Sequence, residues 1–418
     1  MRFLLSVFVV VLVAGCTSVE HVSKQNLAHR YAPQEPLELR GRTVDDGDNL
    51  RVYLRIDARK LGDDATSETL QKRYRFDYRI LPSYKSRQII KEAEDVAFDG
   101  YHGRDARGRF HVSLLVERYP VESVVLVVRA VERSSGKSLV FDLPIFPSRQ
   151  SLDQKYALFG VRRSHPVVDD YLTTADTVII RAPRGGEQML KVHYYQDAFR
   201  PALPPMALNN SVRRRPERDQ LYFLKPGEVM KFAGDGLYFA QEDTTVRDGF
   251  SFVVNRNKFP RVTRAEELIA PLIYISTRKE RERLARADNP KLALDRFWLK
   301  LANDNKDYAR RMIRAYYTRV QEANDRFTTF KEGWMTDQGM IYVVFGPPAK
   351  LLRFNDREEW YYEKSSSTPE TYFVFRRRPT IFTDENYELV RYNEYDRIWY
   401  RNVEQWRKGI GMAPRAGR

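Results

Sequence analysis

The sequence predicts a mixed β and α+β fold: two N-terminal antiparallel β-sandwich-like domains, then a helical segment and a small antiparallel-sheet C-terminal domain. Three observations predict it. Apolar and polar residues alternate through most of the N-terminal half, the periodicity becomes helical near Thr263, and short aromatic strands return after the helices. The length of 418 residues fits two to three domains.

The amino-acid composition excludes several classes of protein. With 42% hydrophobic and 30% charged residues, the chain is typical of a globular protein and not of a polytopic membrane protein or a disordered polymer. Its formal net charge of +15 favours anionic partners. The chain has one cysteine, which excludes an intramolecular disulfide and a thiolate zinc site.

The first sixteen residues predict a lipid anchor. Phe3 to Val13 is an apolar run that is too short to cross a bilayer but fits a secretory signal. The small residues before Cys16 resemble a bacterial lipobox, so we expect 1–15 to be a lipoprotein signal peptide and Cys16 to be lipidated. The two residues after Cys16 include no aspartate, which favours the outer membrane, facing the periplasm. The alternative is an ordinary signal peptide or short anchor with an incidental cysteine.

The N-terminal half divides into three predicted parts. Residues 16–44 are polar and contain prolines, so we expect a tether between the lipid and the folded chain. Residues 45–150 predict the first β-sandwich, with Val124–Val128 as a buried central strand. Residues 151–260 predict a second β-rich domain. Its segment 199–218 is rich in proline and arginine, and we expect a long exposed loop, either a solvated insertion or a docking site for an anionic partner.

The strands expected in these two domains share either a period of two or an unbroken apolar run between turn residues. They are 52–56, 74–80, 110–116, 124–128, 139–145, 177–181, 189–195, 221–224, 229–232, 237–240 and 250–254.

Residues 261–418 predict a helical segment joined to an α+β domain. Capping-box sequences begin at Thr263 and Thr277, and Asn289 with the proline after it ends one helix and starts the next. A long amphipathic helix then leads to Phe327. Short aromatic strands are expected after it, at 340–345, 359–362 and 372–375.

The stretch 327–348, FTTFKEGWMTDQGMIYVVFGPP, resembles one known family. Residues 333–337 (GWMTD) match the motif that names the GWxTD-domain proteins, and residues 346–348 and 359–362 are also similar to that family. The resemblance covers about 235–400. It implies a bacterial lipoprotein with a β-sandwich region, helices and a small sheet, and it implies no established activity.

The motif has a mostly structural interpretation. Gly333 can supply the positive φ of a helix C-cap, and Trp334 can close a small core. Thr336 and Asp337 suit turn hydrogen bonds. The glycine and prolines at 346–348 would end a strand, and the next strand would bring its tryptophan onto Trp334. The motif residues are Gly333, Trp334, Thr336, Asp337, Gly346, Pro347, Pro348 and Trp360.

A catalytic interpretation is the alternative. Asp337 with Glu358 or Glu359 would form an acid–base pair, as in glycan hydrolysis. No histidine or cysteine lies in 194–418, which excludes Ser-His and Cys-His catalysis there. The histidines lack zinc-binding spacing and no phosphate-binding loop occurs, so we assign no catalytic residue, metal ligand or cofactor.

The C-terminal tail mixes cations with aromatic residues and begins at Arg376, Arg377 and Arg378. Such mixtures bind single-stranded nucleic acid in other proteins, but the predicted envelope location disfavours that partner. These arginines form a possible binding surface for a protein or an anionic lipid face. Alternatively the tail wraps its own domain.

Together these patterns predict a cell-envelope lipoprotein that works by binding. We expect a non-enzymatic assembly or scaffold component that sits in the membrane through the lipid on Cys16 and contacts envelope proteins through its GWxTD domain. The alternative is a lipoprotein that binds peptidoglycan, another glycan or an anionic surface through its basic C-terminus. A carboxylate-dependent hydrolase is the third hypothesis, and nucleic acid is not expected as a partner.

Overall fold

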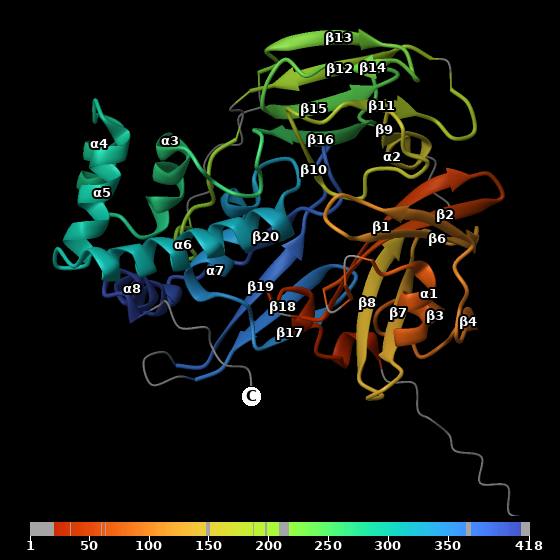
Figure 1. Cartoon of the computed structure of the whole chain (residues 1–418), viewed down its shortest axis with the longest axis horizontal. Helices are drawn as coiled ribbons and strands as arrows, with labels where there is room; N and C mark the ends of the chain where they lie inside the picture. Colours follow the sequence, from red (N-terminus) through yellow and green to blue (C-terminus); the bar gives the residue numbers. More distant parts are fainter. Residues whose placement is uncertain are drawn as a thin grey trace, which may run out of the picture.

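The computed structural model describes residues 21–33, 35–59, 61–62, 64–147, 151–186, 188–196, 199–208, 217–364 and 369–410. Three units pack against one another: a first β-sandwich, a second β unit, and a C-terminal unit of helices and a small sheet (Figure 1). The predicted mixed fold class is confirmed. Cys16 and the predicted signal peptide lie outside the described residues. In the described ranges no helix is long and apolar enough to cross a membrane.

The first unit consists of two facing four-stranded antiparallel sheets. Their order is β1 (Leu37–Asp46), β2 (Asn49–Ala58), β6 (Phe110–Glu117), β5 (Gly100–Arg104) in one sheet, and β4 (Lys91–Ala93), β3 (Tyr74–Leu81), β7 (Val124–Glu132), β8 (Ser138–Ile145) in the other. A short helix, α1 (Ser67–Arg73), precedes β3. The apolar positions of the alternating strands, such as Leu54 and Phe110, form the core between the sheets.

The unbroken apolar run of β7 is explained by the burial of both faces of this strand. Val124, Leu126 and Val128 point into the sandwich core, whereas Val125 and Val127 belong to the core of the C-terminal unit. Because both faces of β7 are buried, both sets of alternating positions are apolar. The first sandwich and the C-terminal unit therefore share β7 as a common wall.

The second unit is also a β-sandwich. Its five-stranded sheet has the order β10 (Tyr171–Thr173), β16 (Phe250–Asn255), β15 (Gly236–Gln241), β12 (Leu190–Tyr195), β13 (Gln220–Leu224), and its three-stranded sheet the order β14 (Val229–Met230), β11 (Val178–Arg181), β9 (Ala157–Gly160). A short helix, α2 (Leu152–Lys155), leads into it. Strand β10 pairs with β16 in parallel, and the other pairs are antiparallel. Ile180, Val192 and Tyr238 lie in the core between the sheets.

The C-terminal unit places helices beside an antiparallel sheet in the order β17 (Lys350–Arg353), β18 (Arg357–Tyr362), β19 (Thr371–Arg377), β20 (Tyr387–Leu389). The helices are α3 (Ala265–Ile269), α4 (Arg278–Ala285), α5 (Pro290–Leu301), α6 (Lys306–Phe327), α7 (Asp337–Phe345) and α8 (Tyr395–Arg407), with 3-10 turns η3 (Ala270–Tyr274) and η4 (Gly333–Met335). Thr277 and Asn289 cap α4 and α5 as predicted. The cap of α3 is Arg264, one residue after the predicted Thr263.

The predicted tether at 16–44 is wrong for its described residues. Val22, Leu27 and Tyr31 are buried, in and around the 3-10 turns η1 (Val22–Lys24) and η2 (Ala28–Arg30). The Leu27 N–H donates to the Leu351 carbonyl at 2.9 Å, so this segment covers the free edge of β17. The first sandwich also begins earlier than predicted, since β1 starts at Leu37. We call residues 21–33 the strap.

The predicted strand at 340–345 is also wrong, because these residues form the end of α7. The run is buried on all sides, and an apolar run of this length does not distinguish a buried strand from a buried helix. Thr336 decides the outcome locally, since its hydroxyl caps the helix. Gly346 then ends α7 with φ of +83°, so the Gly-Pro-Pro sequence stops a helix and not a strand.

Candidate functional site

The GWMTD segment joins the end of α6 to the start of α7. The Gly333 N–H donates to the Thr328 hydroxyl at 3.0 Å, and the Trp334 N–H donates to the Asn324 side-chain oxygen at 3.1 Å. Gly333 is not among the glycines with positive φ, contrary to the predicted C-cap. Glycine is required for a different reason: a Cβ there would lie 2.0 Å from the Ala323 carbonyl oxygen.

Thr336 closes this turn on itself. Its hydroxyl donates to the Gly333 carbonyl at 2.7 Å and accepts from the Gly339 N–H at 3.0 Å. The Trp334 carbonyl accepts from the buried hydroxyl of Tyr274 at 2.9 Å. The motif therefore fixes the angle between α6 and α7 through backbone groups.

Asp337 reaches across to the sheet. Its carboxylate accepts from the Leu389 N–H at 2.8 Å and pairs with Arg391 at 2.5 Å. Arg391 also donates to the Leu203 carbonyl, and the Ala202 N–H donates to the Met335 carbonyl at 2.8 Å. Residues 199–208 form a loop, as predicted for 199–218, but most of them are not exposed, and Ala202 and Leu203 contact the motif and Arg391. The predicted exposure is therefore wrong for most of this stretch.

Comparison with known protein families gives the same assignment. Residues 236–408 match the family model of the GWxTD domain. This chain contains a GWxTD domain. The match begins at β15, so the last two strands of the second unit lie within the GWxTD match. No curated protein matches the chain.

The GWxTD domain holds the first sandwich through a buried arginine. Arg353 on β17 pairs with Asp142 on β8 at 2.5 Å and with Glu358 on β18 at 2.8 Å. The side chains of Asp142 and Glu358 are 0% and 1% exposed. Arg30 adds a second pair to Asp142 at 3.1 Å, and Tyr84 donates to it at 2.6 Å. Every charge in this set therefore has a partner of opposite sign.

Neutral donors complete the same cluster. The hydroxyl of Tyr31, in the strap, donates to both Glu358 oxygens at 3.1 Å, and the Gln338 amide and the Trp360 indole each donate to Glu358 at 2.9 Å. Burial opposes ionisation of Asp142, but Arg30 and Arg353 outweigh it and hold the pKa of Asp142 below its usual value. We call this set the Arg353 cluster: Arg30, Tyr31, Tyr84, Asp142, Gln338, Arg353, Glu358 and Trp360.

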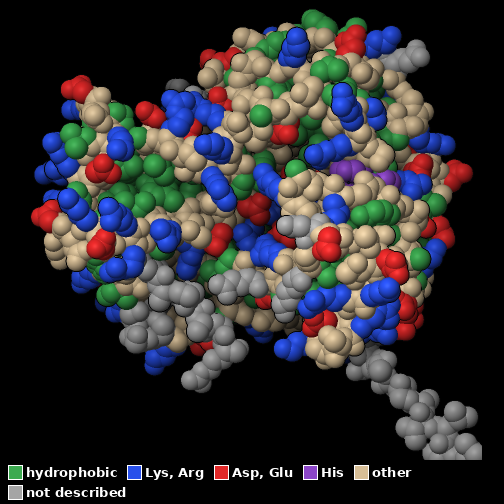
Figure 2. Space-filling model, in the orientation of Figure 1, with side chains coloured by type: hydrophobic (Ala, Val, Ile, Leu, Met, Phe, Trp, Pro, Cys, Tyr) green, Lys and Arg blue, Asp and Glu red, His purple; other side chains and the backbone are tan. Residues whose placement is uncertain are grey.

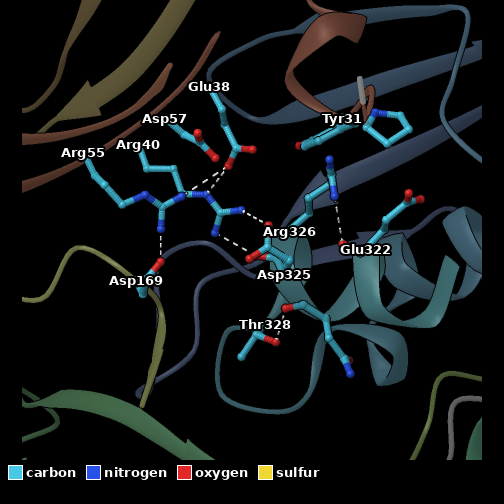
Figure 3. Close-up of polar contacts among 12 residues, drawn as sticks. Tyr31, Glu38, Arg40, Arg55, Asp57, Asp169, Glu322, Asp325, Arg326 and Thr328 are labelled. Carbon is cyan, nitrogen blue, oxygen red and sulfur yellow. Dashed lines mark hydrogen bonds and ion pairs between the residues drawn. The ribbon is translucent and has the colours of Figure 1, made fainter. Parts of the chain in front are cut away.

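A second cluster joins all three units, as Figure 3 shows. Arg40 on β1 pairs with Glu38 at 2.9 Å and with Asp325, at the end of α6, at 2.8 Å. Arg55 on β2 pairs with Asp169 of the second unit. Burial opposes the charge on Asp325, but Arg40 and its neighbours hold the pKa of that carboxyl well below its usual range. We call this set the Arg40 cluster: Glu38, Arg40, Arg55, Asp169 and Asp325.

The surroundings of Arg55 disfavour its charge, in contrast to those of Asp325. Burial, with Arg40 and Arg109 close by, lowers the pKa of Arg55 to about 10, and it still carries its charge at neutral pH. Buried ion pairs of this kind contribute little net stability but are costly to break on one side. The Arg40 cluster therefore links all three units, and loss of one partner of a pair would leave a buried charge unpaired.

A cavity of about 370 Å³ lies among the three units and is lined by residues of both clusters, including Arg40, Arg353 and Glu358. Its lining mixes guanidinium and carboxylate groups, which suits water or a small polar molecule. Within the described ranges no group of three or more histidine, cysteine or acidic side chains is arranged to hold a metal ion.

Histidines gather at the boundary of the first two units, where Figure 2 shows them in purple. The rings of His111 and His165 stack with centroids 3.9 Å apart, and His111 contacts Asp105 at 3.2 Å. Burial, with the charge of His111 second, lowers the pKa of His165 to about 4. Burial also lowers the pKa values of His102 and His111, so this boundary favours neutral imidazoles at pH 7.

The remaining predicted site residues take several places. Trp360 packs on Tyr31, Phe327 and Phe375, whereas a ring contact of Trp334 is with Tyr274. The expected packing of Trp360 on Trp334 gives way to these contacts. Pro347 and Pro348 lead from α7 into β17, with Pro348 buried. The Trp360 indole is held by Glu358, so this residue belongs to the Arg353 cluster.

The three basic residues expected as a binding surface differ from one another. Arg377 donates to the Asp384 carbonyl at 2.9 Å and lies over the Phe146 ring, so it joins the GWxTD domain to the first sandwich. Arg376 and Arg378 are exposed. Two of the three cations are therefore available to a partner.

The carboxylates proposed as an acid–base pair have separate partners. Asp337 pairs with Arg391, Glu358 with Arg353, and Glu359 with Arg357 at 2.8 Å. Retaining and inverting glycosidases need two carboxyl groups that face one bond. These three acids are instead arranged as ion pairs that hold elements together.

Sequence reasoning missed most of both clusters, because their members are single polar residues in unrelated segments. One signal was present. The unbroken run in β7 meant that a second layer covers the outer face of its sheet, and Asp142, on the neighbouring strand β8, lies on that face. A buried carboxylate there requires a cation from the covering layer.

Proposed function

We propose that this protein is a lipid-anchored component of the cell envelope that acts as a scaffold, holding its GWxTD domain in a fixed position for a partner protein. The observation that carries the proposal is the joining of three units by two buried charge clusters. Units that share only small polar interfaces move relative to one another. Here Arg353 and Arg40 bridge units with their charges paired, and β7 serves two cores at once.

The helical side of the GWxTD domain offers the contact surface. Figure 2 shows hydrophobic side chains gathered between α3 and α5. Leu268 and Ile269 on α3 and Ala293 on α5 are partly exposed, and Leu292 on α5 is 45% exposed. Apolar side chains that are exposed together on one side of a domain are typical of protein interaction sites.

Two measurements test the proposal. Mass spectrometry of the membrane-extracted protein should give a chain that begins at Cys16 and carries acyl groups. Co-purification from envelope membranes of the native host in mild detergent should recover a protein partner that Leu292→Glu loses. Val161→Glu is the matched control, because Val161 is 41% exposed and lies in the second unit. An unprocessed chain, or equal recovery with both variants, would contradict the proposal.

The alternative, binding of peptidoglycan or another anionic surface, is favoured by the exposure of Arg376 and Arg378. Sedimentation with purified sacculi tests it. If Arg376→Ser with Arg378→Ser sediments as the unchanged protein does, these arginines bind no such polymer.

A further inference from the structure

A groove opens where the described chain begins. It has a volume of about 520 Å³, and its lining includes Leu352 and Phe354 from the C-terminal unit and three lysines. The lysines come from three separate segments: Lys24 from the strap, Lys85 from the loop after β3, and Lys350 from β17. The groove therefore combines apolar surface with three cations.

These cations are free to meet an anion. Each of the three lysines is exposed, and within the described part of the chain none has a carboxylate partner. The Lys85 ammonium lies 5.6 Å from the Phe354 ring centroid. The nearby acids Asp356 and Glu359 are already paired with Arg357. The electrostatic field at the groove is thus positive.

The position of the groove matters because of the chain that precedes it. His21, the first described residue, is part of the lining, and it follows Cys16 by five residues. Five residues span at most about 18 Å. If Cys16 carries the lipid, as the proposed function requires, the groove lies within about 18 Å of the attachment point. If residues 16–44 formed a tether, as the sequence predicted, the distance between the groove and the attachment point would not be limited in this way.

We propose that this lysine-rimmed groove binds an anionic phospholipid of the membrane that holds the anchor. The ammonium groups of Lys24, Lys85 and Lys350 contact the phosphate and headgroup, and Leu352 and Phe354 contact the upper part of an acyl chain. The site would fix the orientation of the rigid body on the bilayer, with the strap and β17 toward the lipid. The inference rests on the proposed anchor for its biological setting, but the site itself does not need the anchor.

Vesicle binding tests the site directly. The chain from residue 17 onward keeps every described residue and lacks the predicted anchor. It is mixed with vesicles of phosphatidylcholine alone or with one third phosphatidylglycerol, and binding is measured by sedimentation. Each lysine near an anionic surface contributes about five-fold in partitioning, so changing all three lysines to glutamine should weaken binding on the order of 100-fold.

The matched control changes three exposed lysines elsewhere, Lys225, Lys231 and Lys291, to glutamine, with the same change in net charge. All of these side chains are exposed, and thermal melting verifies that both variants fold. The expected result is binding to anionic vesicles that the groove variant loses and the control keeps.

Equal losses in the two variants, or equal binding to neutral vesicles, would overturn the inference. Binding to anionic vesicles that survives in the groove variant would place the lipid contact elsewhere and would also overturn it. Failure of the anchor is a separate outcome, read from the mass of the membrane-extracted protein.

Discussion

Replacing Arg353 by methionine removes the central charge of the Arg353 cluster. Methionine fills a similar volume, but Asp142 and Glu358 stay buried without their main partner. Breaking one side of a buried ion pair costs about 3–5 kcal/mol. Arg30 still pairs with Asp142, and Tyr31, Gln338 and Trp360 still donate to Glu358, so we expect the lower end, about 3 kcal/mol.

Thermal unfolding measures this loss. A unit of 150–250 residues shifts its melting temperature by about 2–4 °C per kcal/mol, which gives a decrease of about 6–12 °C for Arg353→Met. All five tryptophans lie between 298 and 406, so tryptophan fluorescence reports on the GWxTD domain, while circular dichroism reports on the whole chain. Because the first sandwich shares the cluster, both signals should shift together.

Two controls define the result that refutes the reasoning. Lys72→Met removes an ion pair with Glu68 that is about three-quarters exposed, and it should leave the melting temperature unchanged. Adding Glu358→Gln to Arg353→Met neutralises the buried carboxylate that has lost its pair with Arg353, and it should recover part of the loss. Melting of Arg353→Met within about 2 °C of the unchanged protein, or a double variant as unstable as the sum of the two changes, would refute the role of this cluster.

Three further predictions follow from the motif and the histidine boundary. Gly333→Ala should lower the free energy of unfolding in urea by about 3 kcal/mol or more, since the new Cβ would meet backbone atoms. The control Gly136→Ala, at a φ of +69° with open space around it, should cost about 1 kcal/mol. Equal losses in the two variants would argue against the close approach at Gly333. Asp337→Asn should lower the free energy of unfolding by about 1–3 kcal/mol through the loss of its pair with Arg391. If this variant kept its stability but no longer supported the activity of the protein in the cell, the catalytic interpretation would be favoured instead. Burial lowers the pKa of His165 to about 4, so as the pH falls this histidine takes up a proton in the unfolded chain before it does so in the folded protein. The contribution of His165 to stability should therefore be full above pH 6.5 and should fall between about pH 6.5 and pH 4. His165→Gln should flatten that part of a plot of melting temperature against pH.

Strand placement was readable from the sequence because one face of each strand is apolar and packs in the sandwich core. The other face is mostly polar, even where it is buried, as at Arg55 and His111. The alternating strands 52–56, 74–80 and 110–116 lie inside β2, β3 and β6, and Thr277 and Asn289 cap helices as their residue types require. These features are local, so local patterns predict them.

The errors share a physical cause, which is burial against a distant part of the chain. Val22, Leu27 and Tyr31 are too sparse to show a period, yet they bury in the core of the C-terminal unit, where Leu27 bonds to the edge of β17 more than 300 residues away. The run 340–345 is covered on all sides, so its pattern carried no period to separate helix from strand. Gly333 was correctly singled out but for the wrong reason, since its backbone contact with Ala323 is tertiary and leaves no trace in the local sequence.

Site-specific photo-crosslinking at Leu292 in cells of the native host tests the central claim most directly, that the rigid body holds its helical face against a partner protein. A photoreactive residue at Leu292 on α5 should give a discrete crosslinked product with a second envelope protein, and the same residue at Val161 in the second unit should give none. Equal crosslinking at the two positions, or none at Leu292, would contradict the account.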